Sequence, residues 1–297
     1  MFQIAGHTMG TPECSVPEAL SLFSSIGLDG AEIIVQDGYR CAIPEQADAK
    51  TLDLIAGTAA RMNLQIIALT PYYARFNDLE DSVREHEIAG VRRVIQYAQL
   101  LGAKYIRIYA GQFAQTDTDP TGGKRAKLVE SMKRLGDDAL SAGVQLALEN
   151  HFNTMTVSAA DTISIVREID HPAVGILYDQ ANLTFTGNEP WDKALALQLP
   201  KICHCHVKDL VFREGKRDFV SSSVSHPKEE ERNVVTRIVG EGIVPWKNIL
   251  QAMKNIGYQG WLSLEYERRW HPQDIPEAAI GMRRSAEYLR SCIKQLS

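Results

Sequence analysis

The segment Leu146-Ala147-Leu148-Glu149-Asn150-His151 ends a short apolar run, Val144–Leu148, with three polar residues. Strands that are buried on both faces have such continuous apolar runs, whereas half-exposed strands alternate apolar and polar residues. The same pattern recurs along the chain, at Phe2–Gly6, Ala31–Val35, Gln65–Leu69, Tyr105–Tyr109, Val174–Tyr178, Ile202–Val207 and Trp261–Leu264. With the first run this makes eight predicted buried strands.

Segments with helical spacing of apolar residues separate these runs. They are Pro17–Ile26, Ala49–Met62, Val83–Leu101, Lys124–Ala142, Ser158–Ile169, Trp191–Leu199, Trp246–Ile256 and Ile275–Ile293. Strict alternation of strands and helices implies a parallel sheet, and eight such units close into a barrel. A doubly wound sheet would favour a GxGxxG motif after its first strand, and His7–Pro12 has none. We therefore predict an α/β protein with a single (β/α)8 TIM barrel domain over residues 1–297.

One segment departs from this rhythm, at about residues 210–239, where Ser and charged residues accumulate. A loop of this length in a compact domain is usually functional or disordered. We expect a long loop insertion here, which is a lid over the active site, a surface for a partner or a disordered loop. Phe212, Phe219 and Val220 would give a lid apolar material with which to cover a substrate.

Composition excludes several classes of protein. The chain has 297 residues, 44% hydrophobic and 23% charged, with a net charge of −5, so it does not have the basic character of a nucleic-acid-binding protein. No apolar run approaches the ~20 residues of a membrane span. Five cysteines show no disulfide or zinc spacing, and the N-terminus has no signal-peptide pattern, so we expect a cytoplasmic protein.

Metal-capable side chains follow four consecutive predicted strands. In a TIM barrel the active site lies at the C-terminal ends of the strands. Glu149, Asp179, His206 and Glu265 occupy these ends. Three carboxylates and one imidazole suit Mn²⁺, Mg²⁺, Co²⁺ or Zn²⁺ better than a metal that prefers thiolates.

Further polar and aromatic residues are candidates for substrate contacts. His204 and His206 lie on one face of a strand, and we assign His206 to the metal because it is nearer the C-terminal end. Lys208 would reach a substrate oxygen or remain a solvated loop residue. His7 is a candidate for a hydroxyl contact. Aromatic candidates follow the third and eighth runs, at Tyr72, Tyr73, Phe76 and Trp270.

Four segments resemble the sugar-phosphate isomerase/epimerase family, whose barrels are similar to xylose isomerase. They are Leu146–His151, Gly175–Leu183, Ile202–Leu210 and Gly240–Glu265. The strongest match is Gly240-Glu241-Gly242, followed by Pro245-Trp246, Gly257-Tyr258-Gln259-Gly260 and Leu264-Glu265. The family includes ketose 3-epimerases, hydroxypyruvate isomerase and inosose enzymes. The resemblance extends over nearly the whole chain.

The resemblance implies one divalent ion, Mn²⁺ first among the candidates, bound by Glu149, Asp179, His206 and Glu265. It also implies that the two glutamates transfer protons on opposite faces of a small sugar substrate. Two positions depart from the family's pattern. Asn182 stands where these enzymes often have a histidine, and Arg213 only approximately matches an expected arginine. Both remain candidates for substrate binding.

The expected reaction is therefore a metal-dependent isomerisation or epimerisation of a sugar or keto-sugar, by proton abstraction next to a carbonyl through a metal-stabilised enediolate. His151 adds a third catalytic candidate, which leaves open a lyase that acts on 3-keto glycosides and works with a small partner subunit. A non-catalytic sugar-binding barrel is a more remote alternative, as is a DNA-repair barrel of the endonuclease IV type. We expect a homo-oligomer that binds neither nucleic acid nor membranes.

Overall fold

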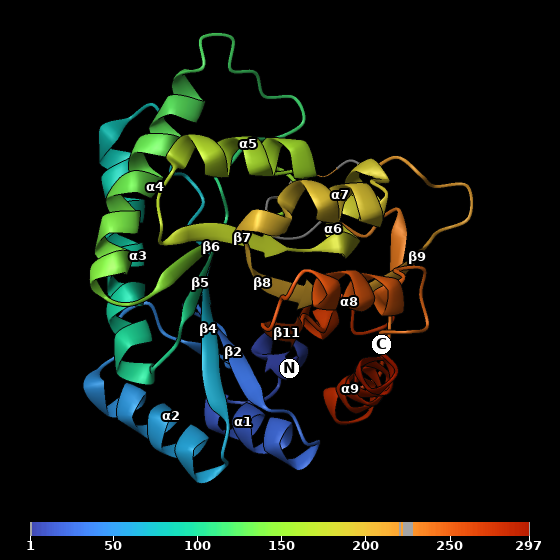
Figure 1. The fold of residues 1–297 in the computed structure, drawn as a ribbon. Helices are drawn as coiled ribbons and strands as arrows, with labels where there is room; N and C mark the ends of the chain where they lie inside the picture. The colour runs from blue at the N-terminus through green and yellow to red at the C-terminus, as the bar shows by residue number, and fades with distance from the viewer. Residues whose placement is uncertain (1, 220, 222–227, 297) are drawn as a thin grey trace.

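The computed structural model describes residues 2–219, 221 and 228–296, and its centre is a closed barrel of parallel strands (Figure 1). β1 pairs with both β2 and β11, which closes the ring, and every other barrel strand pairs in parallel with its two neighbours. The predicted (β/α)8 barrel is confirmed. Its strands are β1 (Gln3–His7), β2 (Gly30–Val35), β4 (Gln65–Pro71), β5 (Tyr105–Ile108), β6 (Gln145–Glu149), β7 (Val174–Tyr178), β8 (Ile202–Val207) and β11 (Trp261–Leu264).

Helices cover the outside of the barrel, each at the place that the apolar spacing predicts. They are α1 (Val16–Ser25), α2 (Ala49–Arg61), α3 (Asp81–Leu101), α4 (Gly123–Ser141), α5 (Ala159–Ile169), α7 (Trp191–Gln198), α8 (Trp246–Asn255) and α9 (Ala278–Lys294). In α8 the buried residues Trp246, Ile249, Leu250 and Met253 form one stripe against the barrel. Burial of each such side chain stabilises the fold by about 1.5–3 kcal/mol.

Short elements that the apolar pattern does not predict lie near the C-terminal ends of the barrel strands. The helix α6 (Gln180–Gly187) begins directly after β7, and the two-residue strand β3 (Ala42–Ile43) pairs with β2. The strands β9 (Asp209–Phe212) and β10 (Val234–Arg237) form an antiparallel ladder after β8.

The segment expected as a loop at about 210–239 is therefore partly regular. Phe219 is only 5% exposed, and Arg232 and Asn233 are 1% exposed. The Phe219 ring packs against the rings of Phe152 and Phe185, and Arg232 pairs with Asp274. Val220 and residues 222–227 lie outside the described residues.

A buried carboxylate fixes the path of the chain on either side of β10. Asp209 accepts hydrogen bonds from the backbone N–H groups of Leu210 (2.9 Å), Gly240 (2.9 Å), Gly242 (3.1 Å) and Val244 (3.0 Å). Gly240 has φ +94°, and a Cβ on Gly242 would lie 2.1 Å from Asp209 Oδ1. The motif Gly240-Glu241-Gly242 is thus the binding loop for this carboxylate.

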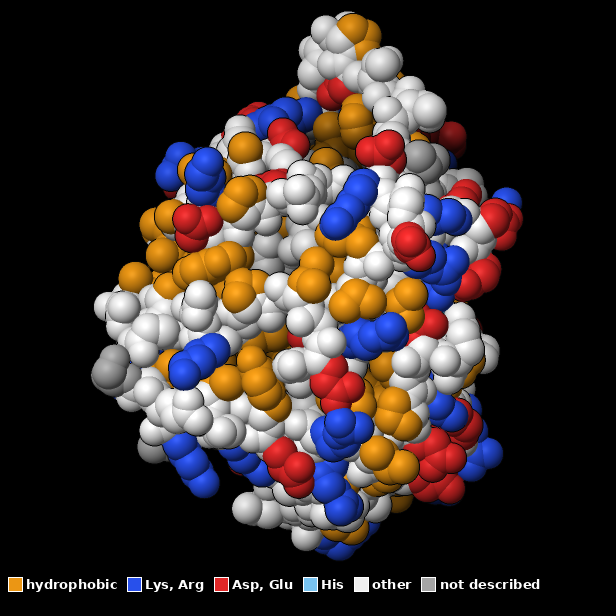
Figure 2. Space-filling model, turned by 90° about the vertical axis from the view of Figure 1, so that its right-hand side faces the viewer, with side chains coloured by type: hydrophobic (Ala, Val, Ile, Leu, Met, Phe, Trp, Pro, Cys, Tyr) orange, Lys and Arg blue, Asp and Glu red, His pale blue; other side chains and the backbone are white. Residues whose placement is uncertain are grey.

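The surface has mixed charge. On the face shown in Figure 2, Lys and Arg side chains are interspersed with Asp and Glu, so this face presents no continuous basic surface. Within residues 2–219, 221 and 228–296, none of the helices has the length and apolar content to cross a bilayer.

Candidate active site

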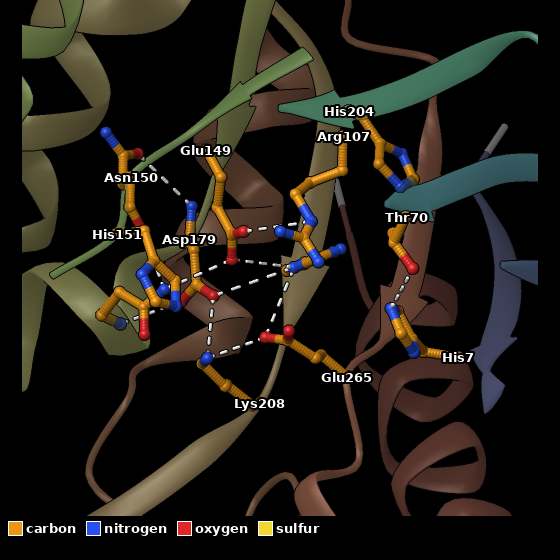
Figure 3. A network of polar contacts seen from close by, with 12 residues as sticks. His7, Thr70, Arg107, Glu149, Asn150, His151, Asp179, His204, Lys208 and Glu265 are labelled. Atoms are coloured by element: carbon orange, nitrogen blue, oxygen red, sulfur yellow. Dashed lines mark hydrogen bonds and ion pairs between the residues drawn. The ribbon is translucent and has the colours of Figure 1, made fainter. Parts of the chain in front are cut away.

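Four acidic or imidazole side chains meet at the C-terminal end of the barrel (Figure 3). Glu149 is the last residue of β6, and Asp179 follows β7 directly and caps α6 by accepting the N–H of Asn182 (2.9 Å). His206 lies in β8, and Glu265 follows β11. Each residue offers one donor atom, and these atoms all lie within 4.8 Å of one another. The four residues are at most 6% exposed.

The geometry of this cluster places one imidazole nitrogen among the three carboxylates. His206 Nδ1 lies 3.3 Å from Glu265 Oε2, 3.4 Å from Glu149 Oε1 and 4.0 Å from Asp179 Oδ2. Burial opposes the charged form of His206, but the nearby carboxylates of Glu265 and Glu32 outweigh it and raise its pKa well above the usual value. Burial raises the pKa of Asp179 to about 7.

Lys208 is the second cation at this cluster. Its Nζ lies 2.7 Å from Glu265 Oε2, 3.1 Å from Asp179 Oδ2 and 3.2 Å from Glu267 Oε1. Burial opposes the ammonium form, yet these carboxylates hold the pKa of Lys208 well above its usual value. The sequence left a substrate contact or a solvated loop lysine open at Lys208, and the structure buries its side chain, which lines the cavity together with Glu265 and Glu267.

The donor set fits a divalent cation. Glu149 Oε2 and His206 Nδ1 are buried and make no hydrogen bond to any described residue, whereas Asp179 Oδ2 is paired with the ammonium of Lys208. Buried polar atoms without a partner are uncommon in native structures and require an explanation such as an ion. Three oxygens and one nitrogen that converge within one coordination sphere are typical ligands for Mn²⁺, Mg²⁺, Co²⁺ or Zn²⁺.

A narrow cavity of about 30 Å³ opens next to this cluster. One part of its wall is polar and includes Lys208, Glu265 and Glu267, while another part is apolar. The remaining lining residues are Met9, Tyr109, His151, Phe152, Phe185, Phe219, Arg232, Asn233, Val234, Thr236, Trp270 and His271. Trp270, expected at the substrate, is thus at the cavity. A cavity of this volume has room for about one or two water molecules.

His151 lies on the cavity wall. Its Nδ1 donates to the carbonyl of Phe152 (3.0 Å), and its ring packs against Tyr109 at a centroid distance of 4.5 Å. In a neutral ring with the hydrogen on Nδ1, Nε2 carries the lone pair. Burial lowers the pKa of His151 to about 4, which keeps this ring neutral at pH 7.

His7 and Asn182 both lie next to residues of the cluster, His7 beside His206 and Asn182 beside Glu149. His7 Nδ1 accepts the N–H of Met9 (3.0 Å), and its Nε2 lies 3.2 Å from Thr70 Oγ1. Burial lowers the pKa of His7 to about 4. Asn182 Nδ2 donates to the carbonyl of Asn150 (2.8 Å) and lies 3.4 Å from Glu149 Oε1, so Asn182 orients a candidate ligand.

Arg213 lies away from this cavity. Its guanidinium pairs with Glu229 in the segment between β9 and β10, and it is not among the described residues that line the cavity. Arg232 from the same segment lines the cavity instead and pairs with Asp274. The expectation of a substrate contact at Arg213 therefore does not fit the geometry, because Glu229 draws the side chain outward.

Sequence reasoning missed two buried charges inside barrel strands. Glu32 in β2 is 0% exposed and contacts His204 and His206. Arg107 in β5 is 2% exposed, lies 3.6 Å from Glu149 Oε2 through Nε, and stacks its guanidinium 3.6 Å from the ring centre of Tyr109. Both positions could have been identified from the sequence, because each is a charged residue within an apolar run. A charged side chain that is buried in a strand needs a polar or charged partner.

Comparison with known proteins gives relatives of several activities. The chain is 28% identical to an inosose dehydratase from Bacillus thuringiensis (strain Al Hakam) over 142 residues, which are 48% of this chain and 47% of that protein. The chain thus spans about half the length of the curated relatives it matches.

Two solved structures share the fold across almost their full length. One is 3-keto-D-glucoside 4-epimerase from E. coli, with a TM-score of 0.74, 17% identity and coverage of 98% of this chain and 100% of that chain. The other is a xylose isomerase-like TIM barrel protein from Mycobacterium smegmatis in complex with magnesium, with a TM-score of 0.74, 18% identity and coverage of 99% and 98%.

The family model described as xylose isomerase-like TIM barrel matches residues 20–292, which include all four side chains of the acidic cluster. The match begins within α1 and ends within α9, so it takes in seven of the eight barrel strands in full. The chain therefore belongs to the xylose isomerase-like TIM barrel family.

Proposed function

We propose that this protein is a divalent-metal-dependent isomerase or epimerase of a small sugar or keto-sugar. The observation that carries the proposal is the convergence of Glu149, Asp179, His206 and Glu265 within 4.8 Å beside a cavity. Proteins similar to this chain include a 3-keto-D-glucoside 4-epimerase and an inosose dehydratase. Removal of a proton next to a carbonyl would be a common first step for epimerisation and for elimination of a ketone substrate.

The cluster would hold one divalent cation through these four side chains, with Mn²⁺ as the first ion to test and Mg²⁺, Co²⁺ and Zn²⁺ as alternatives. A cation bound there supplies Lewis acidity, which polarises a substrate carbonyl and acidifies the neighbouring C–H bond. The magnesium complex of the Mycobacterium smegmatis barrel supports a divalent ion in this fold.

The protein's own carboxylates would move the proton. Glu149 and Glu265 belong to β6 and to the turn after β11, so they reach the cluster from strands that are separated by β7 and β8. One of them would accept the proton from the carbon next to the carbonyl. Return of a proton to the opposite face of that carbon gives an epimer, and its return to the neighbouring carbon gives an aldose–ketose isomer.

Arg107 and Lys208 would set the charge of these two bases. The Arg107 guanidinium lies 3.6 Å from Glu149 Oε2, and Lys208 Nζ lies 2.7 Å from Glu265 Oε2. Each cation favours the ionised carboxylate, which is the form that can accept a proton. Lys208 also lines the cavity, where it would donate a hydrogen bond to a substrate oxygen.

A lyase is the second candidate, and the position of His151 favours it. The Nδ1–H of this ring is used by the Phe152 carbonyl, so Nε2 is available at the cavity wall for proton transfer to or from a leaving group. The 28% sequence identity with an inosose dehydratase over 142 residues supports an elimination reaction as well. With a 3-keto glycoside as substrate, the same proton abstraction would expel the group on the next carbon.

One experiment separates these reactions. Protein loaded with Mn²⁺ is incubated in D₂O with ketohexoses, a keto-inositol and a 3-keto-glucoside, and the products are followed by NMR after removal of the metal. Deuterium incorporation with retention of all oxygens indicates an isomerase or epimerase, whereas loss of water or of an aglycone indicates a lyase. If no substrate exchanges hydrogen and none is converted, while the loaded protein binds them, the catalytic proposal fails and a sugar-binding barrel is left.

A further inference from the structure

A buried carboxylate contacts the histidine of the candidate metal site from the opposite side of the barrel. Glu32 lies in the middle of β2, and its side chain is fully buried. Its Oε1 lies 3.1 Å from His206 Nε2, and its Oε2 lies 3.0 Å from His204 Nε2. An ionised carboxylate can only accept hydrogen bonds, so both rings carry a hydrogen on Nε2.

This contact determines which nitrogen of His206 can bind a metal. In the neutral ring with a hydrogen on Nε2, the lone pair is on Nδ1. Nδ1 is the atom that lies 3.3 Å from Glu265 Oε2 and 3.4 Å from Glu149 Oε1, and it makes no hydrogen bond to any described residue. Glu32 therefore turns the donor atom of His206 toward the other three ligands.

The second histidine holds Glu32 in place. The His204 ring stacks on Tyr105 with a centroid distance of 5.1 Å and an interplanar angle of 12°. Its Nδ1 is buried and has no hydrogen-bond partner in the described chain, so its one polar contact is the bond to Glu32. His204 precedes His206 by two residues in β8, so it lies further from the C-terminal end of this strand. Each oxygen of Glu32 thus has its own N–H donor, and the carboxylate cannot rotate without the loss of both bonds.

We propose that Glu32 is a positioning residue that fixes His206 in the Nε2–H tautomer, with Nδ1 as the donor to a divalent cation. The inference rests on the proposed function, because it requires that the cluster binds a metal. Carboxylates that accept the second N–H of a metal-bound histidine fix its orientation and increase its basicity, and their loss weakens metal affinity by about 10–100-fold.

The first test measures the affinity for Mn²⁺ by electron paramagnetic resonance of the free ion. Glu32→Gln keeps the size of the side chain but offers one acceptor and one donor to two histidines, so one ring must change tautomer. We expect Mn²⁺ binding to weaken by about 10–100-fold. Glu189→Gln is the matched control, because Glu189 caps α5 through Ala159 N and takes no part in the acidic cluster.

His204→Phe is the second variant. It removes the competing histidine while Glu32 can still accept from His206, so the affinity for Mn²⁺ should stay within a few-fold of the wild type. In that background Glu32→Gln can orient its carbonyl oxygen toward His206, and we expect the double variant to bind Mn²⁺ more tightly than Glu32→Gln alone. Equal Mn²⁺ affinity of the Glu32→Gln variant and of the double variant would contradict the tautomer argument.

The second test needs no variant at Glu32. In zinc-loaded protein with ¹⁵N-histidine, long-range ¹H–¹⁵N spectra should show His206 with a hydrogen on Nε2 and the metal on Nδ1, and the His204→Phe spectrum assists the assignment. The opposite tautomer would overturn the proposal. If the wild type binds neither ion, the proposed metal site itself fails; if it binds and Glu32→Gln binds equally well, only the role of Glu32 fails.

Discussion

Replacement of Asp209 by Asn should test how the chain after β8 is held next to the site. Asp209 is 1% exposed, and its two oxygens accept four backbone N–H groups between them. An amide of the same shape must turn its nitrogen toward one pair of these donors, so two hydrogen bonds to a charged group are lost. At about 1.5–3 kcal/mol for each, the free energy of unfolding should fall by about 3–6 kcal/mol.

Urea unfolding followed by circular dichroism measures this loss. With an m-value of about 3 kcal/mol/M, the transition midpoint should fall by about 1–2 M. Asp137→Asn is the control, because the Asp137 side chain is 81% exposed and its pair with His171 at the surface contributes little. A midpoint for Asp209→Asn that coincides with those of the control and the wild type would refute the account of the four N–H bonds.

Four further changes probe the site and its surroundings. Glu149→Gln and Glu265→Gln should each reduce turnover by at least ~10²-fold, because an amide cannot accept a proton; turnover close to that of Glu189→Gln would remove the residue from the mechanism. Dialysis against a chelator should abolish turnover and lower the thermal midpoint, and added Mn²⁺ should restore both; activity that survives in protein shown by elemental analysis to be metal-free would exclude the metal. Gly242→Ala should lower the unfolding midpoint, since its Cβ would lie 2.1 Å from Asp209 Oδ1, and an unchanged midpoint would show that the loop relaxes freely.

The barrel could be predicted because burial on both faces makes each strand a continuous apolar run, and the outer helices carry a strong apolar stripe. The apolar pattern did not predict the helix α6, and the reason is physical. It has apolar and polar residues in no helical order, because Gln180, Ala181, Asn182, Leu183 and Phe185 are all buried against polar as well as apolar partners. Its start depends on Asp179, which caps the helix.

The four candidate ligands could be brought together from the sequence because parallel strands present their ends at one face of a barrel. Their supports could not. Glu32 lies in the middle of β2 and contacts His206 of β8 across the barrel, and Arg107 lies in the middle of β5 and contacts Glu149 at the end of the neighbouring strand β6. Such contacts depend on how far each strand is shifted along the barrel. The outward turn of Arg213 depends in the same way on Glu229, which a linear sequence does not place.

Closure of the ring between β1 and β11 would link the proposed metal affinity to the integrity of the whole barrel. Gln3–Gly6 pair with Trp261–Leu264, and Glu265 comes immediately after that ladder. Any fluctuation that separates these two strands also removes one donor from the cluster, so a cation bound by the cluster and the closed ring would stabilise each other. A ligand that binds only the closed form lowers the population of open forms in proportion to its concentration relative to Kd. Amide hydrogen exchange in β1 should therefore slow when the metal is added, although Glu149, Asp179 and His206 all lie on other strands.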